Sequence, residues 1–523
     1  MFDQLVAAAG GACGAGGVGV WARVENAACA RRLSVIADVL AARLAAADAG
    51  NREQWCVDNW DAVAAEVAAA QNVSLGVAAH QLVVAEALRE RLPRVAEVFA
   101  AGLISYRVVN VIVYRTGLIR DGAAMAKVDA EVAGAVIGWG SWSVARVEEA
   151  IDYWVDRYDP DAVRRVESSA RGRHVDVVED MTGSGVVTVA GVLLAHDGEA
   201  LDRRLDAMAR AVCAGDPRTL EQRRSDALGA LGQGGDRLAC QCGGVDCAAA
   251  EAVPSAVVIN VIAEENSLTD DTAVRLDGAG PPGPSREQLL AMTLAEALAQ
   301  PPGGGPAHTN PAAIIGGGML PAPLLAAKLV GSATIRPVIH PGDRAPEPGY
   351  TPSAGLARFV RCRDMTCRFP GCDEPADLCD VDHTIPYPAG STCASNIKCL
   401  CRKHHLLKTF GGWRDEQLPD GTVVWTSRRG QTYTTYPGSK LLFPSLCQPT
   451  APVIKVDVPS TGTARGLMMP RRTRTRAENH ARAIADERRL NEEIRNRDPD
   501  TPCDNPYFPS QPPPPDEEDP PPF

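Results

Sequence analysis

The chain has 523 residues, of which 45% are hydrophobic and only 5% aromatic, and its 53 basic and 65 acidic residues give a formal charge of −12. This length allows two to four domains, each with its own core. Because the chain is acidic overall, its average electric field does not attract nucleic acid. Any nucleic-acid site must therefore be a local basic patch.

The N-terminus carries no Lys or Arg before its apolar run, and glycines interrupt that run, which makes it a poor signal peptide. No uninterrupted stretch of 18 apolar residues occurs, so we expect no membrane span. Seven of the sixteen cysteines lie between Cys362 and Cys401, interleaved with histidines. This clustering is typical of metal ligation in a reducing compartment, and we therefore expect a cytoplasmic protein.

We expect residues 1–20 to form a flexible arm and residues 21–265 to form a mostly helical domain with an appended β-hairpin. Apolar residues three and four apart predict a helix that ends at Gly50, and a second helix over 60–70. A third helix follows Ser74, whose hydroxyl suits an N-cap, and stops before Pro93.

The hydrophobic period changes at His174. Residues 174–194 alternate around a Gly-Ser-Gly turn and predict a β-hairpin. Helices follow at about 197–214 and 218–231, and residues 255–265 are rich in β-branched side chains.

The segment 61–82 resembles a helix-turn-helix that would direct Leu75, His80 and Gln81 toward DNA. It contains no Lys or Arg, although a phosphate-contacting helix needs them. The pattern therefore favours two packed helices of a bundle.

Pro and Gly are frequent over 266–354, which predicts a linker region with one or two helices. A compact cysteine-rich module follows over 355–447. Residues 448–500 form a further linker and an Arg-rich helix, with ten arginines and five acids between Arg465 and Arg497. That helix either contacts DNA or is a solvated helix with Glu–Arg pairs. Residues 501–523 are acidic and Pro-rich, and we expect a disordered tail.

Four residues of the module have zinc-ligand spacing, and they are Cys367, Cys372, Cys401 and His404. Two short knuckles some thirty residues apart can close a tetrahedral Cys3His site, and zinc would contribute directly to the folding of so small a module. The module's other cysteines, which are Cys362, Cys379, Cys393 and Cys399, compete as ligands, but we expect them to be small buried apolar residues.

A second cluster contains Cys240, Cys242 and Cys247. Three thiols and two glycines can begin a zinc knuckle, but no fourth ligand lies nearby in the sequence. The sequence leaves open whether this cluster binds a metal.

The stretch from Cys367 to Lys408 resembles the HNH endonuclease motif, in which a short hairpin and a helix clamp one divalent ion. The matching residues occur in the family's order, and they are Asp382, His383, Pro386, Gly390, Asn396, Cys401, His404, His405 and Lys408. The resemblance covers about fifty residues.

The chemistry of phosphodiester cleavage suits these side chains. A neutral imidazole can accept a proton near working pH, so His383 is the expected general base. Asp382 points to the opposite side of an extended segment, where with His405 it would ligate catalytic Mg²⁺ or Mn²⁺. Asn396 is expected to fix the loop between the strands through hydrogen bonds to backbone, and Lys408 to contact a phosphate.

The doublet His404-His405 requires a decision, because adjacent side chains on a helix diverge by about 100°. Cys401 is three residues before His404 and four before His405, so either imidazole can join it on zinc. The family pattern assigns His404 to zinc and His405 to the catalytic ion, which leaves Asp382 with a helical partner.

Local charge agrees with a nucleic-acid partner. Residues 358–414 contain nine Lys or Arg and six Asp or Glu, a net charge of +3. We expect Arg363, Arg368 and Lys408 to contact phosphates. We expect Trp413 and Trp425 to belong to the core of the module.

Over most of residues 20–430 the chain resembles the mycobacterial thirteen-E-twelve repeat family. That likeness rests on residues 60–82, 89–109, 367–390 and 400–413. It implies a helical N-terminal domain of unknown function followed by an HNH nuclease domain.

We therefore predict an α+β protein with a mainly helical N-terminal domain, a small β-sheet, a C-terminal zinc-stapled ββα-metal (HNH) module and a disordered tail. The expected function is an HNH endonuclease that cuts DNA, and the sequence does not distinguish DNA from RNA or define the oligomeric state. Two alternatives are a nuclease that has lost activity and a non-catalytic zinc-knuckle protein that binds DNA or protein.

Overall fold

The structure is a computed structural model that describes residues 2–46, 48–139, 142–164, 174–179, 185–244, 247–249, 258–272, 291–293, 309–457 and 468–496. The architecture is mixed α+β, as the sequence predicts, with many helices and four small sheets of two or three strands in the described part. The predicted tail over 501–523 lies outside the described residues.

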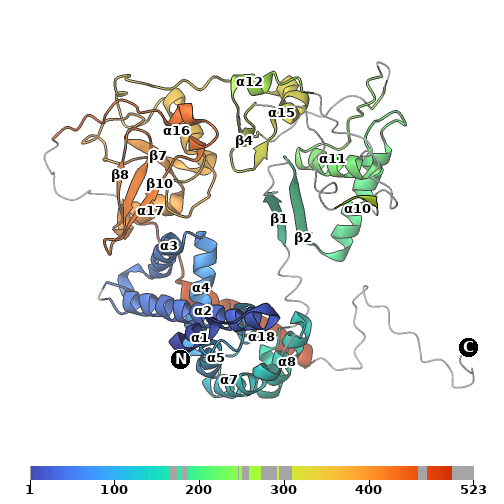
Figure 1. Cartoon of the computed structure of the whole chain (residues 1–523), viewed down its shortest axis with the longest axis vertical. Helices are drawn as coiled ribbons and strands as arrows, with labels where there is room; N and C mark the ends of the chain where they lie inside the picture. The colour runs from blue at the N-terminus through green and yellow to red at the C-terminus, as the bar shows by residue number, and fades with distance from the viewer. Residues whose placement is uncertain are drawn as a thin grey trace, which may run out of the picture. The chain divides into compact units, whose positions relative to one another are not determined.

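The chain divides into two compact units. Figure 1 labels helices and strands of both. The first contains Met1–Ser34, Val84–Arg165 and the chain from Arg474. Its helices are α1 (Phe2–Ala9), most of α2 (Gly14–Leu44), α5 (Pro93–Ala100), α6 (Tyr106–Arg115), α7 (Gly122–Val136), α8 (Val144–Tyr158) and α18 (Arg476–Arg495).

Apolar residues at helical spacing form the core of the first unit. Val128 and Val132 of α7 and Ile151 and Val155 of α8 are fully buried, which accounts for the packing of these helices. Ser105, Asp121 and Ser143 cap α6, α7 and α8 by accepting a hydrogen bond from the backbone of the first turn, as residues of this type commonly do.

The N-terminal residues are helical rather than a flexible arm. α1 covers Phe2–Ala9 and α2 begins at Gly14, so most of residues 1–20 have regular structure. The glycines near position 15 suggested a loose segment. Once the long helix α2 is nucleated, however, each added residue gains a backbone hydrogen bond, so the helix can extend through these glycines.

The second unit contains Val35–Val83 and Val166–Thr473. Its helices are α3 (Asn59–Gln71), the start of α4 (Leu75–Glu90), α10 (Ala195–Arg210), α11 (Leu220–Gly232), α12 (Glu265–Leu268), α15 (Ala322–Lys328), α16 (Ala354–Asp364) and α17 (Arg402–Gly411). Its strands are β1 (His174–Glu179), β2 (Val187–Val192), β3 (Val261–Ile262), β4 (Ala312–Ile314), β5 (Met319–Leu320), β6 (Asp380–His383), β7 (Ile397–Leu400), β8 (Arg414–Gln417), β9 (Val423–Thr426) and β10 (Thr432–Thr435).

The hairpin predicted over 174–194 is present, because β1 and β2 pair antiparallel from His174↔Val192 to Glu179↔Val187. In residues 258–265, the described part of the β-rich run, Val261 and Ile262 form strand β3, which pairs with β4. Part of the predicted linker is therefore ordered, since β4, β5 and α15 all lie between residues 309 and 329.

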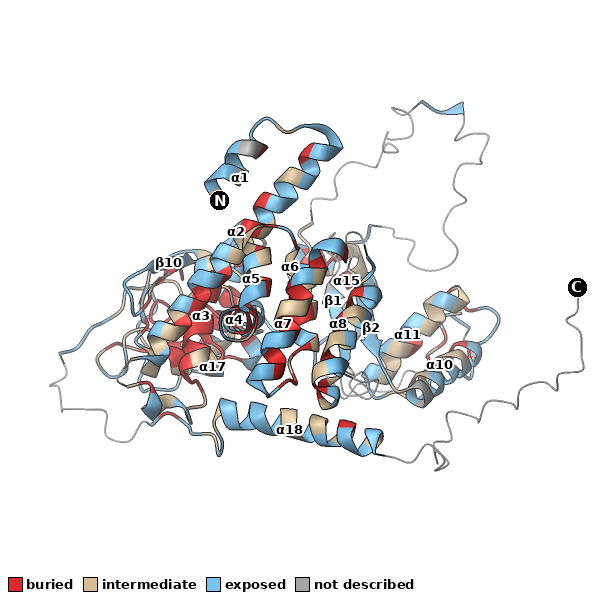
Figure 2. Cartoon of the chain, turned by 90° about the horizontal axis from the view of Figure 1, so that it is seen from below, coloured by how far each residue is buried: buried red, intermediate tan, exposed pale blue. Residues whose placement is uncertain are grey.

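The cysteine–histidine module of residues 355–447 shares its core with a segment far away in the sequence. Val57, Ala62, Ala65 and Ala69 of the α3 region are buried in one cluster with Phe369, and further core residues of the module include Ile397, Leu400, Trp413 and Trp425. Figure 2 shows most of α3 in the colour of buried residues. The predicted single domain over 21–265 is thus divided, and residues 35–83 pack with the module.

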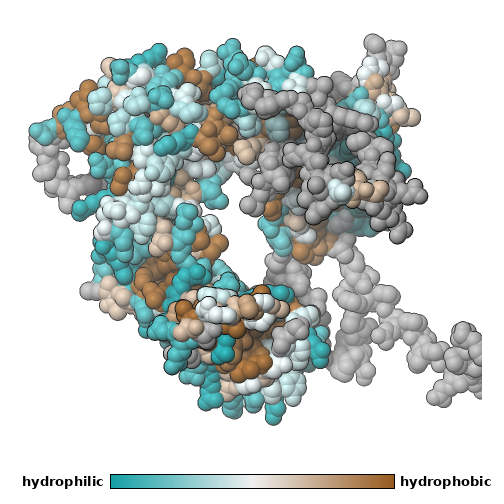
Figure 3. Space-filling model, viewed as in Figure 1, coloured by the Kyte–Doolittle hydropathy of each residue, from teal (hydrophilic) through white to brown (hydrophobic). Residues whose placement is uncertain are grey.

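The exposed apolar side chains of this module are scattered. Leu378, Tyr436 and Leu441 are exposed, and the face seen in Figure 3 mixes hydrophobic with hydrophilic residues. Such isolated exposure is normal for a folded surface. Among the described residues no single helix is long and apolar enough to cross a membrane, and α3 with α4 reaches that composition only as a pair bent by 112°.

Candidate functional site

A hairpin and a helix form the centre of the cysteine–histidine module. β6 and β7 pair antiparallel with Asp382 opposite Lys398. Cys401 directly follows β7, and α17 begins at the next residue. All four residues of β7 are buried, so the short strand lies in the core and directs α17 across the hairpin.

The loop between β6 and β7 is held by Asn396, as the sequence predicts. The fully buried Asn396 amide accepts a hydrogen bond from the Ile385 N–H at 2.9 Å. It donates to the carbonyl oxygens of Ile385 at 3.0 Å and Ser391 at 2.8 Å. These three bonds satisfy the buried amide and fix the loop after His383.

The four predicted zinc ligands lie together. The ligand atoms of Cys367, Cys372, Cys401 and His404 are all within 4.8 Å of one another, so this cluster can hold a metal such as zinc. His404 Nδ1 lies 3.1 Å from Cys401 Sγ and 3.6 Å from Cys367 Sγ. The Phe369 ring stacks on His404 with centroids 4.0 Å apart, which fixes the imidazole plane.

The competing cysteines of the module are not part of this cluster. Cys362, Cys379, Cys393 and Cys399 are buried, as expected for small apolar residues. Burial raises the pKa of Cys362 to about 11, so this thiol stays protonated.

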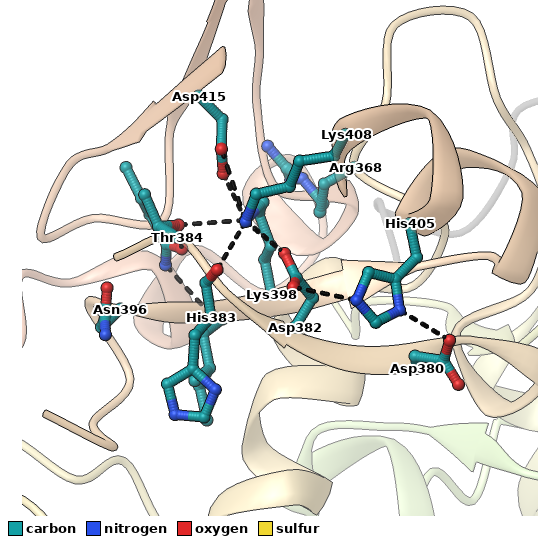
Figure 4. A network of polar contacts seen from close by, with 12 residues as sticks. Arg368, Asp380, Asp382, His383, Thr384, Asn396, Lys398, His405, Lys408 and Asp415 are labelled. Carbon is teal, nitrogen blue, oxygen red and sulfur yellow. Dashed lines mark hydrogen bonds and ion pairs between the residues drawn. The ribbon is translucent and has the colours of Figure 1, made fainter. Parts of the chain in front are cut away.

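His405 is not part of the cysteine cluster and points toward two aspartates, as Figure 4 shows for Asp380 and Asp382. Its Nε2 lies 3.3 Å from Asp382 Oδ1, and its Nδ1 lies 2.9 Å from Asp380 Oδ2. The structure thus separates the two histidines as the 100° rotation between helix neighbours requires. The hydrogen bond with Asp382 raises the pKa of His405 against the effect of burial, and Asp380 adds to the rise.

Asp382 is also bound by two lysines, the fully buried Lys398 and the partly buried Lys408. Its Oδ2 accepts hydrogen bonds from Lys398 Nζ at 3.1 Å and Lys408 Nζ at 2.6 Å. Burial alone would raise the pKa of Asp382, but Lys398, His405 and Lys408 together hold it well below its usual range. Asp415 forms ion pairs with both lysines, at 2.5 Å from Lys398 and 3.4 Å from Lys408. Asp382 is therefore ionised, with Oδ2 occupied by ammonium groups and Oδ1 facing His405.

His383 occupies the other side of β6. Its Nε2 lies 2.9 Å from Thr392 Oγ1, and that hydroxyl donates its only proton to the Gly349 carbonyl at 2.6 Å. The Nε2 atom must then carry a proton and donate it to Thr392, which leaves the lone pair on Nδ1. Nδ1 is buried and has no hydrogen-bond partner within the described residues. Burial lowers the pKa of His383, so the ring is neutral at physiological pH.

Two predicted phosphate contacts are wrong. Arg363 is 1% exposed and donates to Asp364, to the Ala394 carbonyl and to the Ile397 carbonyl. Arg368 is 2% exposed beneath Trp425, whose Nε1 donates to the Arg368 carbonyl. Arg363 thus satisfies several buried acceptors at once. Arg368 donates from Nη2 to the Gly421 carbonyl and the Thr435 hydroxyl, while its Nε and Nη1 have no partner among the described residues. Lys408 is bound to Asp382 and to the His383 carbonyl.

The helix-turn-helix alternative loses one of its predicted DNA contacts. Gln81 is 7% exposed and its Oε1 accepts from Gln71 Nε2 at 2.7 Å, which joins α4 to α3. Leu75 packs against the core of the module. The geometry agrees with the packed-helix interpretation for these two side chains.

The Arg-rich helix α18 pairs several of its arginines with acids. Arg488 lies 2.6 Å from Asp159, and Arg489 and Glu493 form an i,i+4 pair at 2.6 Å. Thr475 and Glu478 form a capping box at its N-terminus. These pairs favour the solvated-helix alternative.

Sequence reasoning missed several residues around the site. They are Asp380, Lys398, Asp415, Thr392 and Tyr350, whose ring stacks on His383 at 5.2 Å. Lys398 could have been recognised, since an isolated lysine in the apolar strand β7 needs a carboxylate partner. Asp415 and Tyr350 gave no local signal. A second cluster of four cysteines lies outside the module and can also hold a metal.

Comparison with known proteins places the chain in a family. The family model "Domain of unknown function (DUF222)" matches residues 21–364, about two thirds of the chain. The chain belongs to the DUF222 family. The matched region ends before Cys367, so the first metal cluster lies outside it.

Mycobacterial proteins resemble the chain over most of its length. The uncharacterized protein Rv2100 of Mycobacterium tuberculosis strain H37Rv is 50% identical over 484 residues, which cover 90% of this chain and 86% of the relative. The uncharacterized protein Rv3776 of the same strain is 48% identical over 475 residues, 89% of this chain and 88% of the relative. No solved structure matches the chain significantly.

Proposed function

We propose that this DUF222 protein is a metal-dependent endonuclease of the HNH class that hydrolyses phosphodiester bonds in DNA. The observation that supports it most is the approach of Asp382 Oδ1 to His405 Nε2 at 3.3 Å. Two ligands at right angles on an octahedral ion, each at about 2.1 Å, lie about 3 Å apart. The pair therefore suits one Mg²⁺ or Mn²⁺ ion.

The surrounding residues prepare this pair for a cation. If Nδ1–H of His405 donates to Asp380, the Nε2 lone pair faces Asp382 Oδ1. With His405 neutral, the three carboxylates of Asp380, Asp382 and Asp415 and the two ammonium groups of Lys398 and Lys408 sum to −1, and the exposed Arg402, which lies 3.2 Å from Asp380, offsets part of that charge. A divalent ion would also find waters and phosphate oxygens for its remaining positions, and it would supply charge neutralisation at phosphorus.

His383 is suited to accept a proton from the attacking water. Its Nε2–H donates to Thr392, so the lone pair lies on Nδ1, and its lowered pKa keeps the ring neutral. A general base needs this protonation state at working pH. Tyr350 and Tyr387 lie beside the imidazole, with ring centroids 5.2 Å and 6.4 Å away, and are exposed. Exposed aromatic rings of this kind can stack on unpaired bases.

A non-catalytic nucleic-acid- or protein-binding protein is the second candidate, and two observations favour it. A protonated His405 would neutralise the remaining charge of the site without any metal, and its raised pKa favours that state. The Nδ1 atom of His383 is buried, so water must gain access before it can act as a base. The zinc-type cluster around His404 is compatible with either function.

Plasmid nicking with Mg²⁺ or Mn²⁺ separates the two candidates. We expect His383→Ala to lower the nicking rate by about 10²-fold or more, the usual loss when a general base is removed. His405→Ala should also lower the rate, because it removes a ligand of the catalytic ion. His480→Ala is the matched control, because His480 is an exposed histidine of α18. DNA binding without nicking by the unmodified chain under either metal would support the non-catalytic candidate, as would full activity of His383→Ala.

A further inference from the structure

Four cysteines of the second unit form a cluster separate from the one that contains His404. Cys213 follows α10, and Cys240, Cys242 and Cys247 lie on the segment after α11. Their sulfur atoms are all within 4.8 Å of one another, and Cys213 Sγ lies 3.4 Å from Cys240 Sγ. Cys213 supplies the fourth thiol that the sequence around Cys240 lacks.

The sulfur separations suit a metal better than a disulfide. A disulfide joins two sulfurs at about 2.05 Å, whereas four sulfurs at about 2.3 Å from a tetrahedral zinc lie about 3.8 Å apart. All four cysteines are free thiols, and none of the pairs among them is at bonding distance. Four mutually close sulfurs also exceed what one disulfide can use.

A backbone N–H group is directed at one of the sulfurs. Cys242 Sγ accepts a hydrogen bond from the Gly244 N–H at 3.4 Å. The donor lies two residues after the cysteine, so the chain turns around the sulfur. Hydrogen bonds from backbone N–H to sulfur stabilise the thiolate, which is the form that binds metal.

Glycine is required where the chain turns at this cluster. Gly243, between Cys242 and its donor Gly244, has φ +69°, a conformation that L side chains rarely adopt. A Cβ on Gly215 would lie 3.5 Å from Cys242 Cβ and 3.7 Å from Cys213 Sγ, which is van der Waals contact. The two loops that carry the cysteines therefore approach closely.

A buried ion pair joins the same two loops. Asp216 and Arg218 pair at 2.7 Å with almost no exposed side-chain surface. Asp216 Oδ2 also accepts from the Gln241 N–H at 2.9 Å, and Arg218 donates to the Ala239 carbonyl at 2.8 Å. The hydrogen bonds of Asp216 hold the pKa of its carboxyl well below the usual range. These contacts fix the loop after α10 against the segment around Cys240.

The hydrophobic core around this cluster is small. α10 and α11 lie side by side (Figure 1). Among the described residues, the buried apolar cluster at this pair consists of Met208, Val212, Ala227, Leu238 and Cys240, with a few partly buried side chains packed on it. Segments of this size rarely gain enough from apolar burial alone, and small folds commonly add a metal. A metal at the four thiols would join the end of α10 to the segment after α11.

We propose that Cys213, Cys240, Cys242 and Cys247 bind a structural zinc ion as a tetrathiolate, and that this ion fastens the α10–α11 pair to residues 238–249. The site lies within the region matched by the DUF222 model, so it belongs to that region and not to the cysteine–histidine module. It does not depend on nuclease activity.

The test is the zinc content of the full-length chain, purified under reducing conditions without added chelator and measured by elemental mass spectrometry. We expect two zinc ions per chain, one in Cys213→Ser and one in Cys401→Ser. Cys13→Ser is the matched control and should keep two, because Cys13 is exposed and belongs to neither cluster. Cys213→His should restore the second ion, since imidazole also binds zinc.

Cobalt substitution gives a second measurement that does not depend on the folding of Cys213→Ser. In the Cys401→Ser chain, the bound Co²⁺ should show the spectrum of a tetrahedral tetrathiolate. A single zinc that is retained in Cys213→Ser, iron in place of zinc, or two zinc ions in Cys213→Ser would overturn the proposal.

Discussion

Replacing Lys398 by Met tests the charge network around Asp382. Lys398 is fully buried and its ammonium group contacts Asp382, Asp415 and the Thr384 hydroxyl, at 3.1, 2.5 and 3.0 Å. Met keeps much of the apolar stem and removes the charge, so packing changes little. The variant therefore isolates the electrostatic contribution.

The expected cost follows from what remains after the substitution. Removing one partner of a buried ion pair costs about 3–5 kcal/mol, because the other charge is left without compensation. Lys408 still lies 2.6 Å from Asp382 and 3.4 Å from Asp415, so it compensates part of the loss. We therefore expect Lys398→Met to lower the local stability of the hairpin by about 3 kcal/mol, the low end of that range.

Hydrogen exchange of the β6 and β7 amides measures this change without unfolding the whole chain. Lys455→Met is the matched control, because Lys455 is an exposed lysine of the same unit, and it should leave the exchange unchanged. Mn²⁺ at a hundred times its Kd should restore protection worth about 2.7 kcal/mol if it binds the folded site. Unchanged exchange in Lys398→Met would refute the role of the network. Absence of any Mn²⁺ effect in both chains would refute the cation site.

Three further predictions concern the module. Gly371→Ala should destabilise it by about 2–4 kcal/mol, because φ is +72° and the new Cβ would lie 2.5 Å from the Val73 carbonyl oxygen. Gly430→Ala is the control: φ there is also positive, but the new Cβ would contact no atom within 4 Å, so it should cost about 1 kcal/mol. Nicking should persist on acidification below the usual histidine pKa of about 6.5, since burial lowers the pKa of His383 and the ring stays neutral to lower pH. The excised fragment 355–447 should fold poorly, because its core lacks the α3 side chains.

Each of these three predictions can be measured directly and has an outcome that would contradict it. Thermal unfolding that gives equal losses for the two glycine variants would show that the close approach does not matter. An acid limb of the nicking profile above pH 6.5 would contradict the lowered pKa. Slow hydrogen exchange and full zinc content in the isolated fragment would show that residues 35–83 are dispensable. Co-expression of 35–83 should raise the yield of folded fragment.

Local spacing predicted the first metal cluster well. Cys367 with Cys372, and Cys401 with His404, each have the spacing of a zinc-binding pair, and the structure brings the two pairs together. The 100° rotation between helix neighbours also separated His404 from His405. The hydrogen bonds of Asn396 were predictable for the same reason, since its acceptors and donor lie within eleven residues.

Features that depend on long-range packing were missed. Arg363 and Arg368 are the kind of side chain that binds phosphate, yet both lie in the core. There they donate to buried carbonyl groups of loops that are distant in the sequence. The sequence assigned α3 to the N-terminal helical domain, whereas its buried residues pack in the core of the cysteine–histidine module. An alanine-rich helix face can pack on many apolar surfaces, so its sequence does not show which one it contacts.

By itself the sequence predicted much of the helix and hairpin pattern, the four residues of the first metal cluster and the different directions of His404 and His405, because ligand spacing and helix geometry are local properties of the chain. Only the tertiary structure decided that Cys213 completes a second cluster from 27 residues before Cys240, that Asp415 and Lys398 neutralise the surroundings of Asp382, and that α3 belongs to the core of the cysteine–histidine module. The physical reason is that burial and charge compensation are set by whichever segments meet in space, and periodicity along the chain does not encode that choice.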